Sequence, residues 1–449
     1  MTALALPTLA GVLADRAIHT HFQPIVDLDS GATVAVEALS RGPAGPFAFP
    51  DALFGTARIE GRLAELDALC RETAVRTAAQ LGLAAPRALF VNIEPEVVDA
   101  AQLAGLVELA ERGAGFDVVL EITERAIAAR PAELLATVRR LRAAGWRIAL
   151  DDVGADDMSL TFMPLLQPDI VKLDLRLVQQ RPDGELARVM HAVNGYAATT
   201  GALVLAEGIE DEAHLAVARS LGATLGQGWL FGRPQPVLPK QPAAGALPLR
   251  RPRAESPGAT PFECLPPGTV LRTSTKRLLV EFSKLFEREA LRLGSTAMVL
   301  AAFERAEHFT PITARRYAEL ADRVGFVAAL GEGLPIAPVP GVRGAVLAAD
   351  DPARHQWDVV VLDAHFAGAL IARDLGDDGP DAERRFEFVL TYDRSVVTAA
   401  ALSLMDRVAA ASGSASSAPK ATSAAPKRAA SAPKSGCTRR TRRPGAAIV

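Results

Sequence analysis

This chain of 449 residues has few cysteines, no excess of positive charge and few long apolar runs. Its three cysteines, Cys70, Cys264 and Cys437, lie far apart, which excludes a disulfide scaffold and predicts a reducing compartment, the cytoplasm by default. With 49 Lys and Arg against 52 Asp and Glu, the formal net charge of -3 argues against a protein built mainly to coat nucleic acid. The N-terminal stretch without Asp, Glu, Lys or Arg, residues 1–14, is shorter than the ~18 apolar residues of a membrane span. No basic residue precedes its apolar part, so we expect no secretory signal.

Two shifts in composition divide the chain, whose length predicts two or three domains. Residues 238–262 are rich in Pro, Ala and Arg without a helical or strand period, as is typical of a linker. From residue 409 the chain becomes Ala, Ser, Pro and Lys with no acidic residue, which predicts a disordered basic tail over 409–449. The cluster CTRRTRRPGAAIV could contact an anionic surface, but a solvated tail is the favoured interpretation. Residues 1–237 and 263–408 are therefore the two expected globular domains.

Short apolar runs alternate with amphipathic helical patterns in the first domain. Several runs are rich in Val, Ile and Leu on both faces, which is typical of a buried parallel sheet. Eight strand and helix units in about 240 residues predict an α/β fold of the TIM-like (β/α)8 barrel type. Only four residues join the first two strands, so one strand should be antiparallel. The expected strands are residues 21–28, 33–41, 88–94, 117–123, 147–153, 170–175, 203–209 and 225–231.

Polar residues interrupt nearly every one of these strands near its carboxyl end, where a barrel of this type places its chemistry. A lone strand carboxylate is more often salt-bridged or exposed, but a series at corresponding positions predicts a cation site. So many inward acids would repel one another without a neutralising ion. Their oxygen ligands suit Mg²⁺, Mn²⁺ or Ca²⁺, and a pair of such ions is typical of displacement at phosphorus. The residues are Glu37, Asn92, Glu121, Glu124, Asp151, Asp152, Lys172, Asp174, Glu207 and Gln227. Lys172 fits beside the attacking water, although it could simply balance the charge of Asp174.

The motifs in these strands, taken in order, resemble the EAL family of cyclic di-GMP phosphodiesterases over about residues 8–237. The motifs are FQPIV, the tripeptide Glu37-Ala38-Leu39 in EALSR, VNIEPE, EITE, DDVG, VKLD, AEGIE and GQGWLFGRP. The resemblance implies hydrolysis of cyclic di-GMP to linear pGpG at a two-metal site with Mg²⁺ or Mn²⁺, in a barrel that forms a homodimer. It implies metal ligands at Glu37, Asn92, Glu121, Asp151, Asp152 and Glu207. Glu37, Lys172 and Glu207 would be catalytic, Gln23, Leu39, Arg41 and Gln227 would contact the substrate, and Glu124 would brace the loop after Asp152.

One loop departs from the family pattern. Where the family usually has DFGTGYSSL, this chain has DVGADDMSL (152–160), with Val153 and two added acids, Asp156 and Asp157. This change leaves open the possibility that the barrel binds cyclic di-GMP without useful turnover and signals through a partner. A third possibility is a scaffold that binds neither nucleotide nor metal. Because every ligand position matches, we expect an active phosphodiesterase.

The second domain has an α+β pattern without the spacing of a metal site or nucleophile. Its histidines, His308, His355 and His365, are expected to be ordinary surface or core residues. The stretch FERAEHFTPITARRYAEL resembles the DICT sensory domain found beside cyclic di-GMP enzymes. The resemblance implies that this domain senses an unidentified signal and adjusts the barrel.

Overall fold

The structure is a computed structural model that describes residues 7–94, 100–123, 131–155, 158–239, 245–248 and 260–408. The predicted tail, most of the predicted linker, Glu124, Asp156 and Asp157 lie outside these described residues. No described helix combines the length and the apolar character that crossing a membrane requires.

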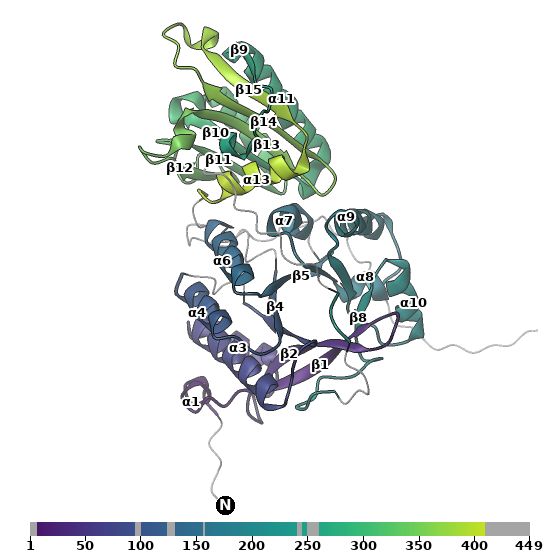
Figure 1. Ribbon diagram of the computed structural model, residues 1–449. Coiled ribbons are helices and arrows are strands. Elements are labelled where there is room, and N and C mark those ends of the chain that lie inside the picture. The colour runs from purple at the N-terminus through teal and green to yellow at the C-terminus, as the bar shows by residue number, and fades with distance from the viewer. Residues whose placement is uncertain are drawn as a thin grey trace, which may run out of the picture. The chain divides into compact units, whose positions relative to one another are not determined.

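The first domain is a closed barrel of eight strands with helices around it, as predicted (Figure 1). Strand β1 runs antiparallel to both β2 and β8, and the other neighbouring strands pair in parallel. The strands are β1 (His19–Asp27), β2 (Thr33–Arg41), β3 (Ala88–Asn92), β4 (Asp117–Ile122), β5 (Arg147–Val153), β6 (Ile170–Leu173), β7 (Leu203–Ala206) and β8 (Leu225–Gln227). The helices are α1 (Leu9–Ala14), α2 (Pro50–Ile59), α3 (Leu63–Gln80), α4 (Ala100–Glu111), α6 (Pro131–Ala143), α7 (Met158–Leu166), α8 (Leu175–Gln179), α9 (Gly184–Thr200) and α10 (Glu212–Ser220).

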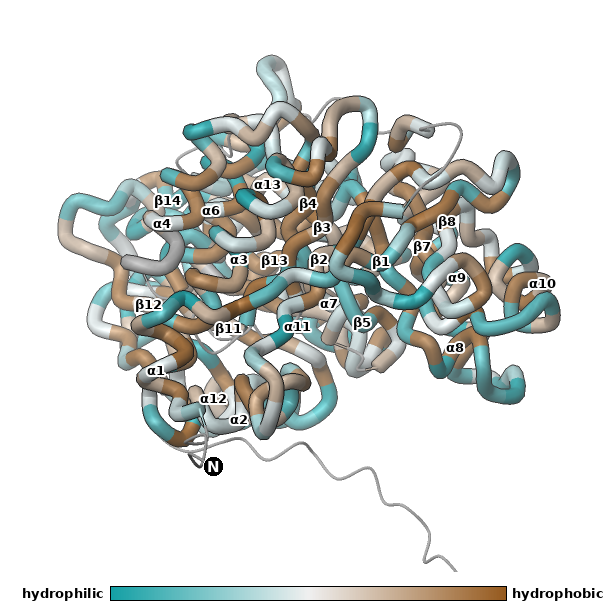
Figure 2. Tube along the Cα trace, turned by 90° about the horizontal axis from the view of Figure 1, so that it is seen from below, coloured by the Kyte–Doolittle hydropathy of each residue, from teal (hydrophilic) through white to brown (hydrophobic). Residues whose placement is uncertain are grey.

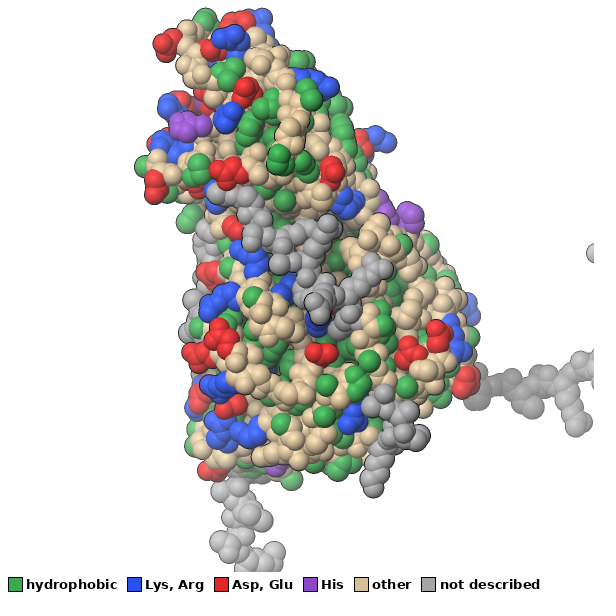
Figure 3. Space-filling view, in the orientation of Figure 1, with side chains coloured by type: hydrophobic (Ala, Val, Ile, Leu, Met, Phe, Trp, Pro, Cys, Tyr) green, Lys and Arg blue, Asp and Glu red, His purple; other side chains and the backbone are tan. Residues whose placement is uncertain are grey.

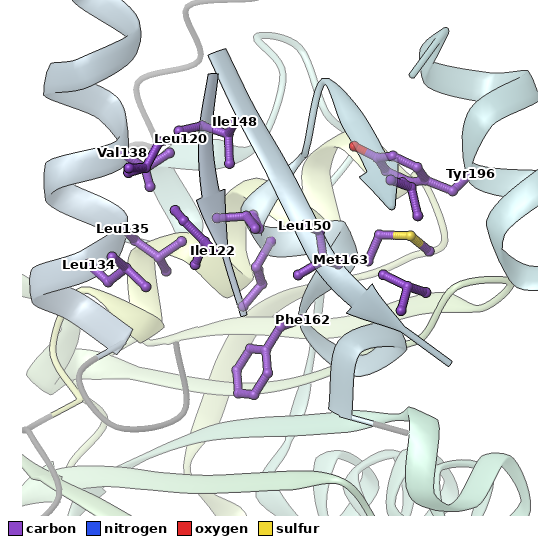
Figure 4. Packing of buried hydrophobic residues seen from close by; sticks show 14 of the residues in the cluster. Leu120, Ile122, Leu134, Leu135, Val138, Ile148, Leu150, Phe162, Met163 and Tyr196 are labelled. Atoms are coloured by element: carbon purple, nitrogen blue, oxygen red, sulfur yellow. The ribbon is translucent and has the colours of Figure 1, made fainter. Parts of the chain in front are cut away.

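Two apolar layers hold the barrel together. Residues that point into the barrel, such as Phe90, Val119 and Leu205, form one cluster, and the alternate residues form a larger cluster with the surrounding helices. The strand segments of β3 and β4 are accordingly apolar in Figure 2. Figure 4 shows part of the outer layer, where Val138 of α6 lies beside Leu120 of β4. Apolar side chains on both faces explain why these strands read as continuous apolar runs.

The second domain is a seven-stranded mixed sheet with the order β12-β11-β10-β13-β14-β15-β9. Residues of α11 and α12 pack in one apolar cluster with one face of the sheet, and α13 packs in another cluster with the opposite face. The elements are β9 (Arg272–Thr275), α11 (Lys276–Leu293), β10 (Met298–Arg305), α12 (Pro311–Arg323), β11 (Phe326–Glu332), β12 (Arg343–Val346), β13 (Gln356–Leu362), β14 (Ala367–Asp374), β15 (Arg385–Thr391) and α13 (Arg394–Met405).

Charges of both signs are interspersed on the face of the molecule shown in Figure 3. The described acids and bases on the surface form many ion pairs, for example Arg62 with Glu65 at 2.7 Å and Arg58 with Glu94 at 2.6 Å. Exposed pairs of this kind contribute little to stability. The unusual charges of the chain are the buried ones.

Candidate active site

The parallel strands carry their polar residues to one end of the barrel, as the sequence predicted. Glu37 lies in β2, Asn92 ends β3 and is in register with Glu121 of β4, and Gln227 ends β8. The remaining candidates follow in order: Asp151 and Asp152 in β5, Lys172 in β6 and Glu207 directly after β7. Closure of the barrel places all of these carboxyl ends around one mouth.

Lys172 is the centre of an acidic cluster and is 1% exposed. Its Nζ forms salt bridges to Glu121, to Asp151 Oδ1 at 2.9 Å and to Glu207 Oε1 at 2.8 Å. Burial by itself would lower the pKa of Lys172, but the surrounding carboxylates raise it well above its usual value. Lys172 is therefore held as a cation among three acids.

Two of these acids favour the protonated form. Burial raises the pKa of Glu121 well above its usual value, and the negative charge of Glu37 adds to the shift. Burial likewise raises the pKa of Glu207 to about 8, although Lys172 acts in the opposite direction. One ammonium group thus offsets only part of the negative charge at the barrel mouth.

A second group of hydrogen bonds joins the other candidates. Asn92 Nδ2 donates to Glu37 Oε1 at 3.0 Å, and Gln227 Nε2 donates to Glu37 Oε2 at 2.5 Å. Gln23 is in register with Glu37 and donates through Nε2 to the carbonyl oxygen of Gly232 at 3.2 Å. These bonds fix the side chain of Glu37, which is 7% exposed, beside the acidic cluster. Leu39 and Arg41 follow on the same strand, where Arg41 Nη1 donates to the Ser40 carbonyl at 2.8 Å.

The carboxylate oxygens fit a divalent cation. One oxygen each from Asp151, Asp152 and Glu207 lies within 4.8 Å of the others. Within the described residues, Oε2 of the buried Glu121 has no hydrogen-bond partner. A buried, unsatisfied carboxylate oxygen is costly unless a cation approaches it, so the donor set suits a hard metal ion with oxygen ligands.

Asp174 was wrongly expected to face this cluster. Its side chain caps α8 by accepting from the Arg176 backbone N–H at 2.8 Å, and it also pairs with the Arg176 guanidinium. An Asp at the first residue before a helix is a preferred cap, and the turn into α8 directs Asp174 away from Lys172. The interpretation of Lys172 as the partner of Asp174 is therefore excluded, because its partners are Glu121, Asp151 and Glu207.

Three supporting features were not identified from the sequence. Asp152 adopts φ 55°, a left-handed conformation that non-glycine residues rarely take and that is frequent at functional sites. Gly208 has φ 68°, and a Cβ there would lie 2.6 Å from Leu175 Cβ, so only glycine allows this turn after Glu207. Asp67 and Arg71 form a buried ion pair in α3, and Asp67 Oδ1 accepts from the Glu94 backbone N–H at 3.3 Å. Their i, i+4 spacing in one helix was the one signal available beforehand.

The closed barrel and the acidic residues at its mouth place this chain among α/β barrel proteins with a candidate metal site. Residues 8–234 match the family model of the EAL domain, and the chain belongs to this family. Residues 263–375 match the model of DICT, described as a sensory domain in diguanylate cyclases and two-component systems.

Curated relatives match the barrel. The cyclic di-GMP phosphodiesterase NbdA of Pseudomonas aeruginosa is 30% identical over 237 residues, which cover 51% of this chain and 30% of NbdA. The cyclic di-GMP phosphodiesterase RocR of the same organism is 30% identical over 244 residues, which cover 51% of this chain and 62% of RocR. This chain thus matches less than two thirds of the length of these relatives.

Two solved structures are also similar. One is a PaMucR phosphodiesterase complex with c-di-GMP, with 26% identity, a TM-score of 0.46 and coverage of 51% of this chain and 96% of that one. The other is a manganese and cy-diGMP complex of Klebsiella pneumoniae BlrP1 at pH 9.0, with 29% identity, a TM-score of 0.44 and coverage of 49% and 56%.

Proposed function

We propose that the barrel hydrolyses cyclic di-GMP to linear pGpG with Mg²⁺ or Mn²⁺. The observation that best supports this proposal is that carboxylate oxygens of Asp151, Asp152 and Glu207 lie within 4.8 Å of one another, beside the buried Lys172. Membership of the EAL family and the names of its phosphodiesterase relatives supply the substrate class. The proposed domains are the barrel over 1–237, the linker over 238–262, the sensory domain over 263–408 and the tail over 409–449. We further propose a cytoplasmic location and a homodimer.

The metal ligands in this proposal are Glu37, Asn92, Glu121, Asp151, Asp152 and Glu207. Bound divalent ions would activate water and neutralise the negative charge that develops on the phosphate. The unsatisfied Glu121 Oε2 supports a cation at this position, because a buried carboxylate without a partner is otherwise destabilising. Glu37 is already oriented by Asn92 and Gln227.

The side chains of the chain itself have separate roles. Lys172 supplies a fixed positive charge beside the reacting phosphate, and in a buried site such a charge stabilises an anionic transition state more than it does in water. Glu207, which lies beside Lys172 at the barrel mouth, would assist as a general base. Gln23, Leu39, Arg41 and Gln227 would contact the nucleotide. Glu124 would brace the loop after Asp152, although it lies outside the described residues.

The test is turnover by the purified full chain. Incubation with cyclic di-GMP and Mn²⁺ or Mg²⁺ should yield pGpG by chromatography, and chelation should stop the reaction. Glu37→Gln keeps the size of the side chain but removes its charge, and should lower turnover by a factor of about 100 or more. Glu108→Gln is the matched control, because Glu108 lies near the end of α4 and is 69% exposed. Full activity in Glu37→Gln would refute the assigned site.

The altered loop DVGADDMSL supports a second candidate, a barrel that binds cyclic di-GMP without turnover. Calorimetric binding of cyclic di-GMP in the presence of Ca²⁺, combined with no pGpG in Mn²⁺ or Mg²⁺, would favour that candidate over the enzyme.

A further inference from the structure

The second domain contains a charged pocket at one edge of its sheet. The parallel strands β10 and β11 end at this edge, and the antiparallel strand β13 begins there. Among the described residues, those that line the pocket are all Asp, Glu, Arg or His. Its volume is about 210 Å³, below the ~300–1,000 Å³ of pockets for drug-sized ligands. Both the size and the lining of the pocket suit a small charged molecule.

The pocket forms where the connections to neighbouring strands part. After β10 the chain turns to one face of the sheet, where Ala306 and Phe309 pack in the apolar cluster of α11 and α12. Before β13 the chain lies on the other face, where Ala353 packs in the apolar cluster of α13. In open sheets, ligands bind in the crevice between such diverging connections, beyond the carboxyl ends of parallel strands.

Strand β10 is irregular where it reaches the pocket. Between the pairs Ala302–Leu330 and Arg305–Glu332, β10 contains one residue more than β11. Glu304 lies within this bulge, has φ 54° and is 5% exposed. A left-handed backbone at a residue other than glycine is costly and occurs often at ligand sites, and bulges redirect side chains beside such sites. The bulge places two consecutive charged side chains, Glu304 and Arg305, in the lining of one pocket.

The inner part of the pocket is a closed network of ion pairs. Arg384 Nη2 donates to Glu304 Oε1 at 3.0 Å and also pairs with Asp374. Lys276 Nζ donates to Asp381 Oδ1 at 2.6 Å. Since these acids already have bases beside them, the network does not require a metal ion. A ligand would therefore bind to groups that the network leaves with hydrogen-bonding capacity.

Arg305 is one such group. Its guanidinium lies 3.7 Å from Glu307 Oε1 and 3.7 Å from Glu332 Oε2, and both distances are longer than a hydrogen bond. The side chain of Arg305 is 63% exposed. A guanidinium presents parallel N–H groups that match the two oxygens of a carboxylate. Arg305 is therefore suited to a carboxylate of the ligand.

His308 and Asp381 form the opposite end. His308 Nδ1 lies 3.0 Å from the Phe303 carbonyl oxygen and 3.2 Å from Glu304 Oε2. Because both of these neighbours are acceptors, Nδ1 carries the proton, and Nε2 of the neutral ring is left as an acceptor. Nε2 lies 3.9 Å from Asp381 Oδ1. Two acceptors at this separation can share one ammonium group, which has three N–H donors.

We propose that the charged pocket binds a small zwitterion of the α-amino acid class. The carboxylate of the ligand pairs with Arg305, and its ammonium group donates to His308 Nε2 and to Asp381. A ligand with both charges is favoured, because Glu307 repels a lone anion and Arg384 repels a lone cation. His308, which the sequence predicts to be an ordinary surface or core residue, is then a ligand-binding residue. The inference does not rest on the proposed function, since the described lining of the pocket includes no barrel residue.

The experiment is calorimetric titration of the full chain with each standard L-amino acid at pH 8. At least one of them should bind with a dissociation constant of about 1 mM or lower. Acetate and methylammonium carry only one of the two charges, and each should bind at least about ten-fold more weakly than that amino acid. Glycine betaine has both charges but no N–H group, so it should not bind.

Two variants locate the ligand that binds most tightly. Arg305→Gln removes the partner of the carboxylate and should raise the dissociation constant about ten-fold or more. Arg323→Gln is the matched control, because Arg323 at the end of α12 is also 63% exposed and lies 3.5 Å from Glu319. His308→Asn keeps a donor near the Phe303 carbonyl but has no acceptor at the position of Nε2, so it should weaken binding by a similar factor. If His308→Asn does not fold, the exposed Arg305 keeps the test intact.

The outcomes decide the inference without reference to the barrel. Weaker binding in Arg305→Gln and unchanged binding in Arg323→Gln support the inference. Titrations in which no amino acid binds would overturn it, and so would acetate or methylammonium that binds as tightly as the amino acid. Unchanged affinity in Arg305→Gln would place the ligand outside this pocket and also overturn the inference. Failure to hydrolyse cyclic di-GMP would remove the proposed function and leave the amino acid site standing.

Discussion

The barrel mouth and the charged pocket of the second domain both contain acidic and basic side chains. The two sites differ in how fully the bases compensate the acids. At the barrel mouth Lys172 faces Glu121, Asp151 and Glu207, and Glu121 Oε2 has no hydrogen-bond partner within the described part of the chain. The pocket of the second domain has a volume of about 210 Å³ and is lined by acids and bases together.

The acids that line that pocket each have a basic partner. Arg384 pairs with Glu304 at 3.0 Å and with Asp374, and His308 Nδ1 lies 3.2 Å from Glu304. Lys276 Nζ donates to Asp381 at 2.6 Å. Both regions also contain an acid with a left-handed backbone, Asp152 with φ 55° and Glu304 with φ 54°. The comparison shows that a buried acid or a strained backbone does not by itself mark a cation site, whereas uncompensated negative charge does.

The largest expected effect comes from removing the central base of each cluster. Lys172→Met leaves Glu121, Asp151 and Glu207 without a counter-charge, and without metal it should lower the free energy of unfolding by about 3–5 kcal/mol. Excess Mn²⁺ should reduce this loss, because the ion supplies the missing positive charge. Chemical denaturation with and without Mn²⁺ measures both values.

Arg384→Met is the counterpart in the second domain, where it removes the base that Glu304 and Asp374 share. It should also be destabilising, but by the same amount with and without Mn²⁺. Equal rescue of the two variants by Mn²⁺ would contradict the distinction between the two clusters.

The next effect is the dependence of stability on pH. The pKa of Glu207 is raised from 4.5 to about 8 in the folded chain, so between these values the folded chain holds a proton that the unfolded chain has released. Without metal, stability should therefore fall as the pH rises through this window, by up to about 1.4 kcal/mol per pH unit. With Mn²⁺ the slope should reverse, since the ion binds ionised carboxylates and competes with protons.

Thermal unfolding from pH 5 to pH 8 tests the reversal. Glu207→Gln should reduce the metal-free slope, and Glu121, whose pKa is also raised, should account for the remainder. Asp381 in the second domain behaves oppositely. Burial opposes its ionisation, but Lys276 and His308 hold the pKa of Asp381 below its usual value, so its contribution is lost only in acid. A metal-free slope that is undiminished in Glu207→Gln would contradict the assignment of a proton to Glu207.

The sequence predicted the barrel because its strands are apolar on both faces and its motifs keep their order. Strand ends were less well predicted, because local hydrogen bonds decided them. The strand expected over 170–175 ends at Leu173, since Asp174 instead caps α8. The sequences of β9 and β12, RTST and RGAV, do not predict these strands, because they lack the alternation of a half-buried strand.

The residues that gather at the barrel mouth were predictable from the motifs, but the balance of charge among them was not. The partners of Lys172 follow from neighbouring strands, since β6 lies between β5 and β7 and so brings Asp151 and Glu207 to either side. The backbone of Asp152 carries no signal in the sequence, because Asp adopts the left-handed region only where its surroundings require it.

The smallest expected effect compares two glycines with positive φ. Gly333, after β11 in the second domain, has φ 72°, and the nearest atom to a Cβ would be Ala306 Cβ at 3.8 Å. Gly333→Ala should therefore cost only the backbone strain, about 1 kcal/mol, and leave Mn²⁺ affinity unchanged. Gly208→Ala adds a clash with Leu175 Cβ at 2.6 Å to a similar strain, so it should cost more and displace the neighbouring Glu207. Denaturation curves give the two costs, and Mn²⁺ titration should show weaker binding in Gly208→Ala alone. Equal Mn²⁺ affinity in both variants would mean that the position of Glu207 does not govern the metal site.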